Sequence, residues 1–247
     1  CKMNFIKNNL ANAFTLANLF SGSIGVINMI TGNYHITAIC IIVSLVLDFF
    51  DGFIARALKS NSNLGAQLDS LADMVSFGLL PGIVMYKALE PFGNQIFGTE
   101  LPFEIKYFGL LITLFSCLRL AIFNLDEEQA YYFKGLNTPS NTILIFGLYY
   151  YIETISLNFN NLNYILMNMH LKGGILIFIT ILSSWLLIAP IKMIAMKFKS
   201  MKLEDNYPKI ALLIGAVLIL ILFKTVGIPL VILYYIFISI IFQKQLK

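Results

Sequence analysis

Long apolar segments separated by short polar breaks recur along the whole chain. A transmembrane helix needs roughly 20 mostly apolar residues, and several of the segments reach that length. The short segment at 140–154 is followed by a polar stretch around Asn158 to Asn163, which could be an outer loop or a partly buried re-entrant segment. We therefore expect an all-α, polytopic membrane helical bundle of about eight helices, at about residues 13–31, 35–58, 66–89, 105–123, 140–154, 173–195, 208–223 and 226–243.

The composition supports a membrane protein. The 247 residues are 58% hydrophobic and only 12% charged, whereas soluble domains carry about a quarter charged residues. No segment is left over for a soluble domain, so we expect a single integral membrane domain over residues 1–247. The formal charge of +4 could suggest nucleic acid, but the basic residues form no long run. We therefore expect no nucleic-acid partner.

The distribution of Lys and Arg predicts the orientation, because cytoplasmic loops carry the excess of basic residues. Of the 17 basic residues, thirteen fall on one predicted side and four on the other, namely Lys87, Lys106, Lys172 and Lys224. The basic side contains both chain ends and the loop between the second and third helices. We expect both termini and this loop to be cytoplasmic.

Four aspartates lie at the two helix ends that flank this loop. Asp48 and Asp51 are spaced i and i+3, and Asp69 and Asp73 are spaced i and i+4, so each pair lies on one helix face. The two faces can meet across the helical hairpin. The spacing therefore predicts a cluster of four carboxylates at the cytoplasmic face.

The negative charge of such a cluster must be compensated by positive charge. An acidic side chain costs on the order of 2.5 to 3.5 kcal/mol at the centre of a membrane helix, and less near the interface. In the sequence only Arg56 and Lys59 lie close by, and two cations cannot neutralise four anions. Carboxylates are preferred ligands of Mg²⁺, Mn²⁺ and Ca²⁺, and pairs of such ions clamp phosphoryl groups. We expect Mg²⁺ or Mn²⁺, with Ca²⁺ as an alternative and two ions in the site.

Two other interpretations of the aspartates fit the sequence less well. Carboxylates solvated at a loop would explain Asp69 alone, but not Asp48 inside an apolar run. A divalent-cation transporter would need polar residues along the membrane depth, whereas here they gather at one end. Nearby small residues, Gly52, Ala55 and Gly65, either let a ligand approach the backbone or serve helix packing.

The eight positions of this region resemble the signature of the CDP-alcohol phosphatidyltransferase family. They are Asp48, Asp51, Gly52, Ala55, Arg56, Gly65, Asp69 and Asp73. The resemblance implies a six-helix core, at about residues 10–195, that holds a CDP-linked lipid, with an additional hairpin at 208–243. It also implies a homodimer.

The resemblance assigns roles to the signature residues. Asp48, Asp51 and Asp69 would bind metal and the nucleotide end of the lipid, together with Gly52, Ala55, Arg56 and Gly65. Asp73 would complete the metal site and act as general base on the incoming hydroxyl. A carboxylate within hydrogen-bonding reach can accept that proton. Thr15 and Asn18, one turn apart on the first helix, could face the cytidine or bond a neighbouring helix.

Further segments resemble the bacterial and archaeal membrane-type phosphatidylserine synthases of this family. They read NAFTLANLFSG at 12–22, DSLADMVSFGLLP at 69–81, CLRLAIFN at 117–124 and FKGLNTP at 133–139. The resemblance implies phospholipid biosynthesis in a prokaryotic inner membrane, with transfer of a phosphatidyl group from CDP-diacylglycerol to L-serine.

The acceptor site is the less defined part of the resemblance. Ile122 and Asn137 stand where arginine and proline are usual, so Arg119 or Lys134 would have to hold a serine carboxylate. Thr138 lies in the same predicted loop as Lys134. Another alcohol, such as glycerol 3-phosphate, stays open as the acceptor, although an anionic acceptor would call for more basic side chains.

Overall fold

The structure is a computed structural model that describes residues 2–57, 63–96, 99–125, 132–156, 162–195 and 203–243. Lys59 and the stretch at 157–161 lie outside the described residues. The helices are α1 (Lys2–Ile30), α2 (Tyr34–Ala57), α3 (Asn63–Asp73), the π-helix η1 (Met74–Leu79), α4 (Leu80–Leu89), the 3-10 helices η2 (Glu90–Phe92) and η3 (Ile105–Gly109), α5 (Leu110–Leu125), α6 (Thr138–Ser156), α7 (Leu162–Ile188), α8 (Leu203–Phe223), the 3-10 helix η4 (Lys224–Val226) and α9 (Gly227–Ile241).

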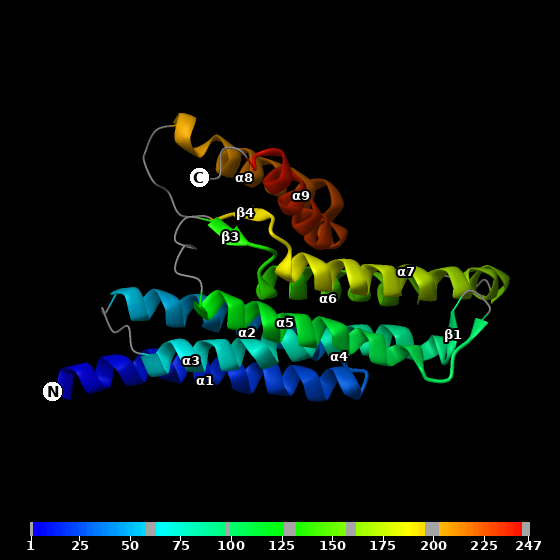
Figure 1. The fold of residues 1–247 in the computed structure, drawn as a ribbon, viewed down its shortest axis with the longest axis horizontal. Helices are drawn as coiled ribbons and strands as arrows, with labels where there is room; N and C mark the ends of the chain where they lie inside the picture. Colours follow the sequence, from blue (N-terminus) through cyan, green and yellow to red (C-terminus); the bar gives the residue numbers. More distant parts are fainter. Residues whose placement is uncertain are drawn as a thin grey trace.

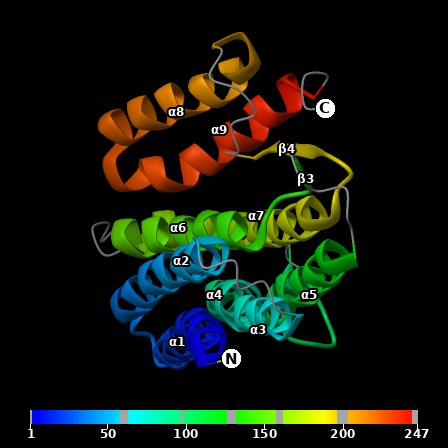
Figure 2. The same ribbon diagram turned by 90° about the vertical axis from the view of Figure 1, so that its left-hand side faces the viewer.

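The predicted all-α membrane bundle is confirmed. Five helical stretches within the described residues are long and apolar enough to cross a membrane, and α3, η1, α4 and η2 together form one of them. Helices α1 to α7 run side by side along the long axis, and the α8–α9 hairpin lies over α6 (Figure 1, Figure 2). The start of α1 lies at the same end of the molecule as the end of α2 and the start of α3 (Figure 1).

On α2, polar side chains face inward and many apolar side chains face outward, as expected when lipid is the solvent. On α2, Thr37, Ser44 and Asp51 are buried, whereas Ile39 and Ile42 are largely exposed. The hydroxyls of Thr37 and Ser44 donate hydrogen bonds to backbone carbonyls of α1. Hydrogen bonds of this kind hold α1 and α2 together along their length.

The π-helix η1 was not predicted from the sequence, and it follows directly after Asp73. Pro81 has no N–H, so the carbonyl of Phe77 could not be satisfied four residues on in a regular α-helix. Instead, the hydroxyl of Thr142 on α6 donates to this carbonyl at 3.2 Å. The hydroxyl of Thr113 on α5 donates to the carbonyl of Gly78 at 3.2 Å. Tertiary contacts therefore stabilise the wide turn.

Two short antiparallel ribbons were also not predicted. Strands β1 (Gln95–Ile96) and β2 (Thr99–Glu100) pair at the end of the molecule opposite the end of α2 (Figure 1). Strands β3 (Tyr132–Lys134) and β4 (Lys192–Ile194) pair beside α9. The predicted helix at 173–195 is wrong at both ends, because α7 starts at Leu162 and stops at Ile188, before Pro190 and β4. Proline disfavours a helical conformation in the residue before it.

Candidate active site

The four aspartates converge as the spacing predicts. Asp48, Asp51 and Asp69 each offer one carboxylate oxygen, and these three oxygens lie within 4.8 Å of one another. Asp73 lies beside Asp48 and is almost fully buried. Helix α2 supplies the first pair and α3 the second, and both helices pack against α1.

Helix α1 supports the aspartates from behind. Thr15 is 3% exposed, and its hydroxyl donates to Asp51 Oδ2 at 2.7 Å. Asn18 is fully buried, and its side-chain amide donates to Asp73 Oδ1 at 3.4 Å. The carbonyl of Asn18 accepts hydrogen bonds from Ser44 on α2 and Ser76 on η1. Of the two alternatives for Asn18, the structure thus shows contacts with neighbouring helices.

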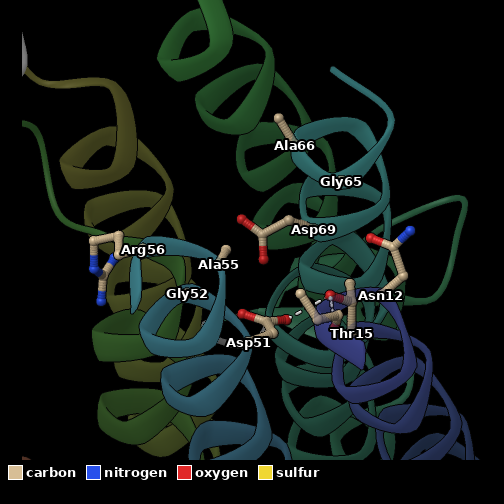
Figure 3. Close-up of a pocket in the computed structure, with 10 residues that line it drawn as sticks. Asn12, Thr15, Asp51, Gly52, Ala55, Arg56, Gly65, Ala66 and Asp69 are labelled. Atoms are coloured by element: carbon tan, nitrogen blue, oxygen red, sulfur yellow. Dashed lines mark hydrogen bonds between the residues drawn. The ribbon is translucent and has the colours of Figure 1, made fainter. Parts of the chain in front are cut away.

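A first cavity of about 230 Å³ opens between α1, α2 and α3. Figure 3 shows Asp51 and Asp69 facing this space, with Thr15 and Asn12 on the α1 side. Predicted small residues line it as well, namely Gly52, Ala55 and Gly65, together with Ala11, Ala66 and Arg56. A Cβ atom on Gly52 would lie 3.2 Å from Nη1 of Arg56, so the guanidinium folds back along α2 over this glycine.

A second cavity of about 350 Å³ lies between α2, α3, α5 and the start of α6. It shares Asp51, Gly52, Arg56 and Asp69 with the first cavity, and Asp48 and Asp73 also line it. Its far wall consists of Arg119, Leu120, Phe123, Asn137, Thr138 and Pro139. The aspartates therefore lie where the two cavities meet.

The predicted acceptor residues are placed differently from one another. Arg119 and Thr138 are nearly buried and line the second cavity. Lys134 lies on β3, a few residues before this wall, and is not among the lining side chains. Ile122 is 41% exposed and does not line the cavity either. The acceptor role of Lys134 stays a prediction.

The described part of the chain supplies little positive charge to compensate the four carboxylates. No lysine or arginine of the described residues lies within salt-bridge distance of the four aspartates, since the described ion pairs are Lys87–Glu90 and Lys106–Glu104. One oxygen of Asp69 is buried without a hydrogen-bond partner. Clustered carboxylate oxygens of this kind are suited to a hard divalent cation. The residues present therefore fit a metal site.

Some lining residues were not predicted from the sequence. Asn12 could have been found, because it lies one turn before Thr15 on the same helix face. Phe49, Leu120, Phe123 and Pro139 carry no polar signal, so only the packed structure reveals them. Asn137 caps α6, since its Oδ1 accepts the backbone N–H of Ser140 at 2.9 Å.

The fold and the site define an integral membrane protein with an acidic cluster suited to divalent cations. The chain belongs to the CDP-alcohol phosphatidyltransferase family, whose model matches residues 8–196. It is 31% identical over 125 residues to the CDP-diacylglycerol--serine O-phosphatidyltransferase of Bacillus subtilis (strain 168), a match that covers 51% of this chain and 66% of the relative.

Two further relatives match a similar share of the chain. The Saccharomyces cerevisiae protein of the same name is 29% identical over 160 residues, covering 58% of this chain and 54% of the relative. The archaetidylserine synthase of Methanothermobacter thermautotrophicus is 28% identical over 142 residues, covering 57% of each chain. These matches span between about half and two thirds of the relatives' lengths. Helices α8 and α9 lie beyond the family match.

Proposed function

We propose that this protein transfers the phosphatidyl group of CDP-diacylglycerol to the hydroxyl of L-serine, giving phosphatidylserine and CMP. The observation that carries the proposal is the meeting of two cavities on the aspartate cluster. One cavity suits the CDP end of the lipid, and the other suits a small alcohol. The names of the relatives support serine as that alcohol.

The reaction needs a base and an in-line displacement. The serine hydroxyl oxygen forms a bond to the phosphorus that bears the diacylglycerol, and the bond from that phosphorus to the CMP oxygen breaks. The hydroxyl proton goes to a carboxylate, a role that we assign to Asp73. Asp73 lines the second cavity, and the hydrogen bond from Asn18 holds one of its oxygens.

We propose that the aspartate cluster holds divalent metal ions. Asp48, Asp51, Asp69 and Asp73 would hold Mg²⁺ or Mn²⁺, with Ca²⁺ as the alternative, in a site for two ions. The bound metal would supply positive charge that neutralises the pyrophosphate and makes CMP a better leaving group. Thr15 fixes the orientation of Asp51 from behind, through the hydroxyl that donates to Oδ2.

The binding residues follow from the two cavities. We assign Thr15, Gly52, Ala55, Arg56 and Gly65 to the CDP end, with Asp48, Asp51 and Asp69 between the two substrates. Asn18 would act on this end only through its neighbours, because it lines neither cavity. Arg119 and Thr138, with Lys134 nearby, would hold the serine carboxylate.

We also propose the oligomeric state, the membrane and the orientation of the protein. We expect a homodimer in a prokaryotic inner membrane, with the aspartates at the cytoplasmic face. The excess of basic residues on the side of the aspartates supports this orientation. The core at 10–195 and the hairpin at 208–243 would form one integral domain.

The proposal is tested with purified protein, CDP-diacylglycerol and a panel of labelled alcohols that contains L-serine, glycerol 3-phosphate and inositol phosphate. We expect label from serine to enter lipid in a 1:1 ratio with CMP release. Incorporation of glycerol 3-phosphate alone would overturn serine as the acceptor. If none of the alcohols led to release of CMP, the proposed transferase activity would be overturned.

A further inference from the structure

Helix α9 carries three polar side chains at one-turn intervals, Tyr235, Ser239 and Gln243, the last just beyond the helix end. Residues spaced by four lie on one helix face. This face is turned toward strand β4, and α9 packs against that strand. A polar row on an otherwise apolar membrane helix needs partners, because the bilayer offers none.

All three side chains bond to the backbone of β4. The hydroxyl of Tyr235 donates to the carbonyl of Ile194 at 3.0 Å, and Ser239 Oγ accepts the N–H of Ile194 at 3.2 Å. The amide of Gln243 donates to the carbonyl of Lys192 at 2.6 Å and accepts the N–H of Lys192 at 3.2 Å. Helix α9 therefore satisfies the N–H and C=O groups of two residues of this strand.

Strand β4 in turn fixes the segment that leads into the second cavity. It pairs with β3, with Lys192 opposite Lys134. The next residue, Gly135, donates its N–H to the carbonyl of Ile191 at 2.8 Å, and Leu136 donates to the carbonyl of Leu186 at 2.8 Å. The chain then continues directly into Asn137, Thr138 and Pro139, which form part of the wall of the second cavity.

Gly135 shows how closely this segment is held. Its φ is +80°, which favours glycine, and an added Cβ would lie 2.4 Å from the carbonyl oxygen of Leu187. The segment cannot shift without breaking its contacts with the end of α7 and with β4. Its position therefore depends on where β4 lies.

A second link joins α9 to the same cavity. Tyr235 lies within electrostatic reach of Arg119, and Arg119 lines the wall opposite the aspartates. Both side chains are largely buried. One residue of α9 thus bonds to β4 and also interacts electrostatically with a cation that lines the second cavity.

We propose that α9 acts as a clamp on strand β4 and thereby sets the geometry of the acceptor pocket. Tyr235, Ser239 and Gln243 are positioning residues for the acceptor alcohol, although they lie outside the family match at 8–196. The assignment of the second cavity to the acceptor rests on the proposed function. The hairpin of α8 and α9 then has a role in acceptor binding as well as in the lipid-facing surface.

The test compares two neighbouring tyrosines. The hydroxyl of Tyr235 bonds to β4, whereas the hydroxyl of Tyr234 donates to the carbonyl of Ala211 inside the hairpin at 2.9 Å. Tyr235→Phe and Gln243→Leu are the test variants, and Tyr234→Phe is the matched control. The KM values for the acceptor and for CDP-diacylglycerol are measured on the full-length chain, with whichever alcohol the wild-type protein uses.

We expect the acceptor KM to rise about three- to tenfold in Tyr235→Phe and more in Gln243→Leu, which loses two hydrogen bonds to Lys192 of β4. The KM for CDP-diacylglycerol should change less than twofold, and Tyr234→Phe should match the wild type. If Gln243→Leu fails to fold, Ser239→Ala takes its place as the milder change.

Unchanged acceptor KM values in the test variants would overturn the clamp, as would equal changes in both KM values. A control variant that behaves like Tyr235→Phe would overturn it too, because hairpin stability would then be the cause. The proposed function fails separately, if the wild-type protein does not use serine. In that case the KM of the acceptor that the protein does use still tests the clamp.

Discussion

Replacing Thr15 by valine removes one hydroxyl and keeps the side-chain shape. That hydroxyl donates to Asp51 Oδ2 at 2.7 Å, and Thr15 is 3% exposed, so water cannot readily replace it. A hydrogen bond to a charged group contributes about 1.5 to 3 kcal/mol. If the bond holds Asp51 in the geometry that the reaction needs, its loss lowers kcat/KM roughly 10- to 150-fold.

The assay is incorporation of labelled serine into lipid by purified Thr15→Val in detergent, with Thr15→Ser as the matched control. Serine keeps the hydroxyl, so Thr15→Ser should retain activity within about threefold of the wild type. Thermal unfolding of both variants separates loss of function from loss of folded protein. The double variant with Asp51→Asn should lose little beyond Asp51→Asn alone, because the two side chains act through one bond.

Equal kcat/KM values for Thr15→Val and the wild type would refute the reasoning, since Asp51 would then not depend on this donor. A loss in Thr15→Ser as large as that in Thr15→Val would also refute it, because packing of the missing methyl group would explain both.

Three further outcomes are expected. Asp73→Asn should lower kcat by about 10² to 10⁴, the range of general-base catalysis, while affinity for CDP-diacylglycerol changes less than tenfold; activity near the wild-type rate would remove Asp73 from the base role. Gly22→Ala should lower stability by about 1 to 3 kcal/mol in thermal unfolding, because its Cβ would lie 2.1 Å from Ser76 Oγ and 2.8 Å from Ser76 Cα, and an unchanged melting temperature would contradict the close packing of α1 on η1. Chelation with EDTA should abolish transfer and added Mn²⁺ or Mg²⁺ should restore it, whereas transfer that persists in EDTA would exclude a metal requirement.

Most of the helical fold could be predicted from the sequence, because every helix that crosses a bilayer needs a long apolar run. Apolar runs such as the one in α2 mark the spans directly. The prediction was wrong at α7, where the apolar pattern continues past Ile188 although the helix stops before Pro190. Hydropathy alone does not distinguish a buried strand such as β4 from a helix end.

The aspartate cluster could be predicted for a different reason, since helical spacing places each pair on one face. The contacts that complete the site could not, because they join residues that are distant in the sequence. Asn18 reaches Asp73 across 55 positions, and Thr142 reaches Phe77 across 65. The polar row of α9 on β4 likewise depends on a ribbon that no local pattern predicts.

We propose that the aspartates hold divalent metal against the pyrophosphate of the lipid. Electron paramagnetic resonance of Mn²⁺ with the purified protein, with and without CDP-diacylglycerol, tests this directly. We expect protein-bound Mn²⁺ that shows phosphorus coupling when the lipid is present, and loss of both signals in Asp69→Asn. Mn²⁺ that stays fully hydrated at millimolar concentration, or binds equally to Asp69→Asn, would contradict it.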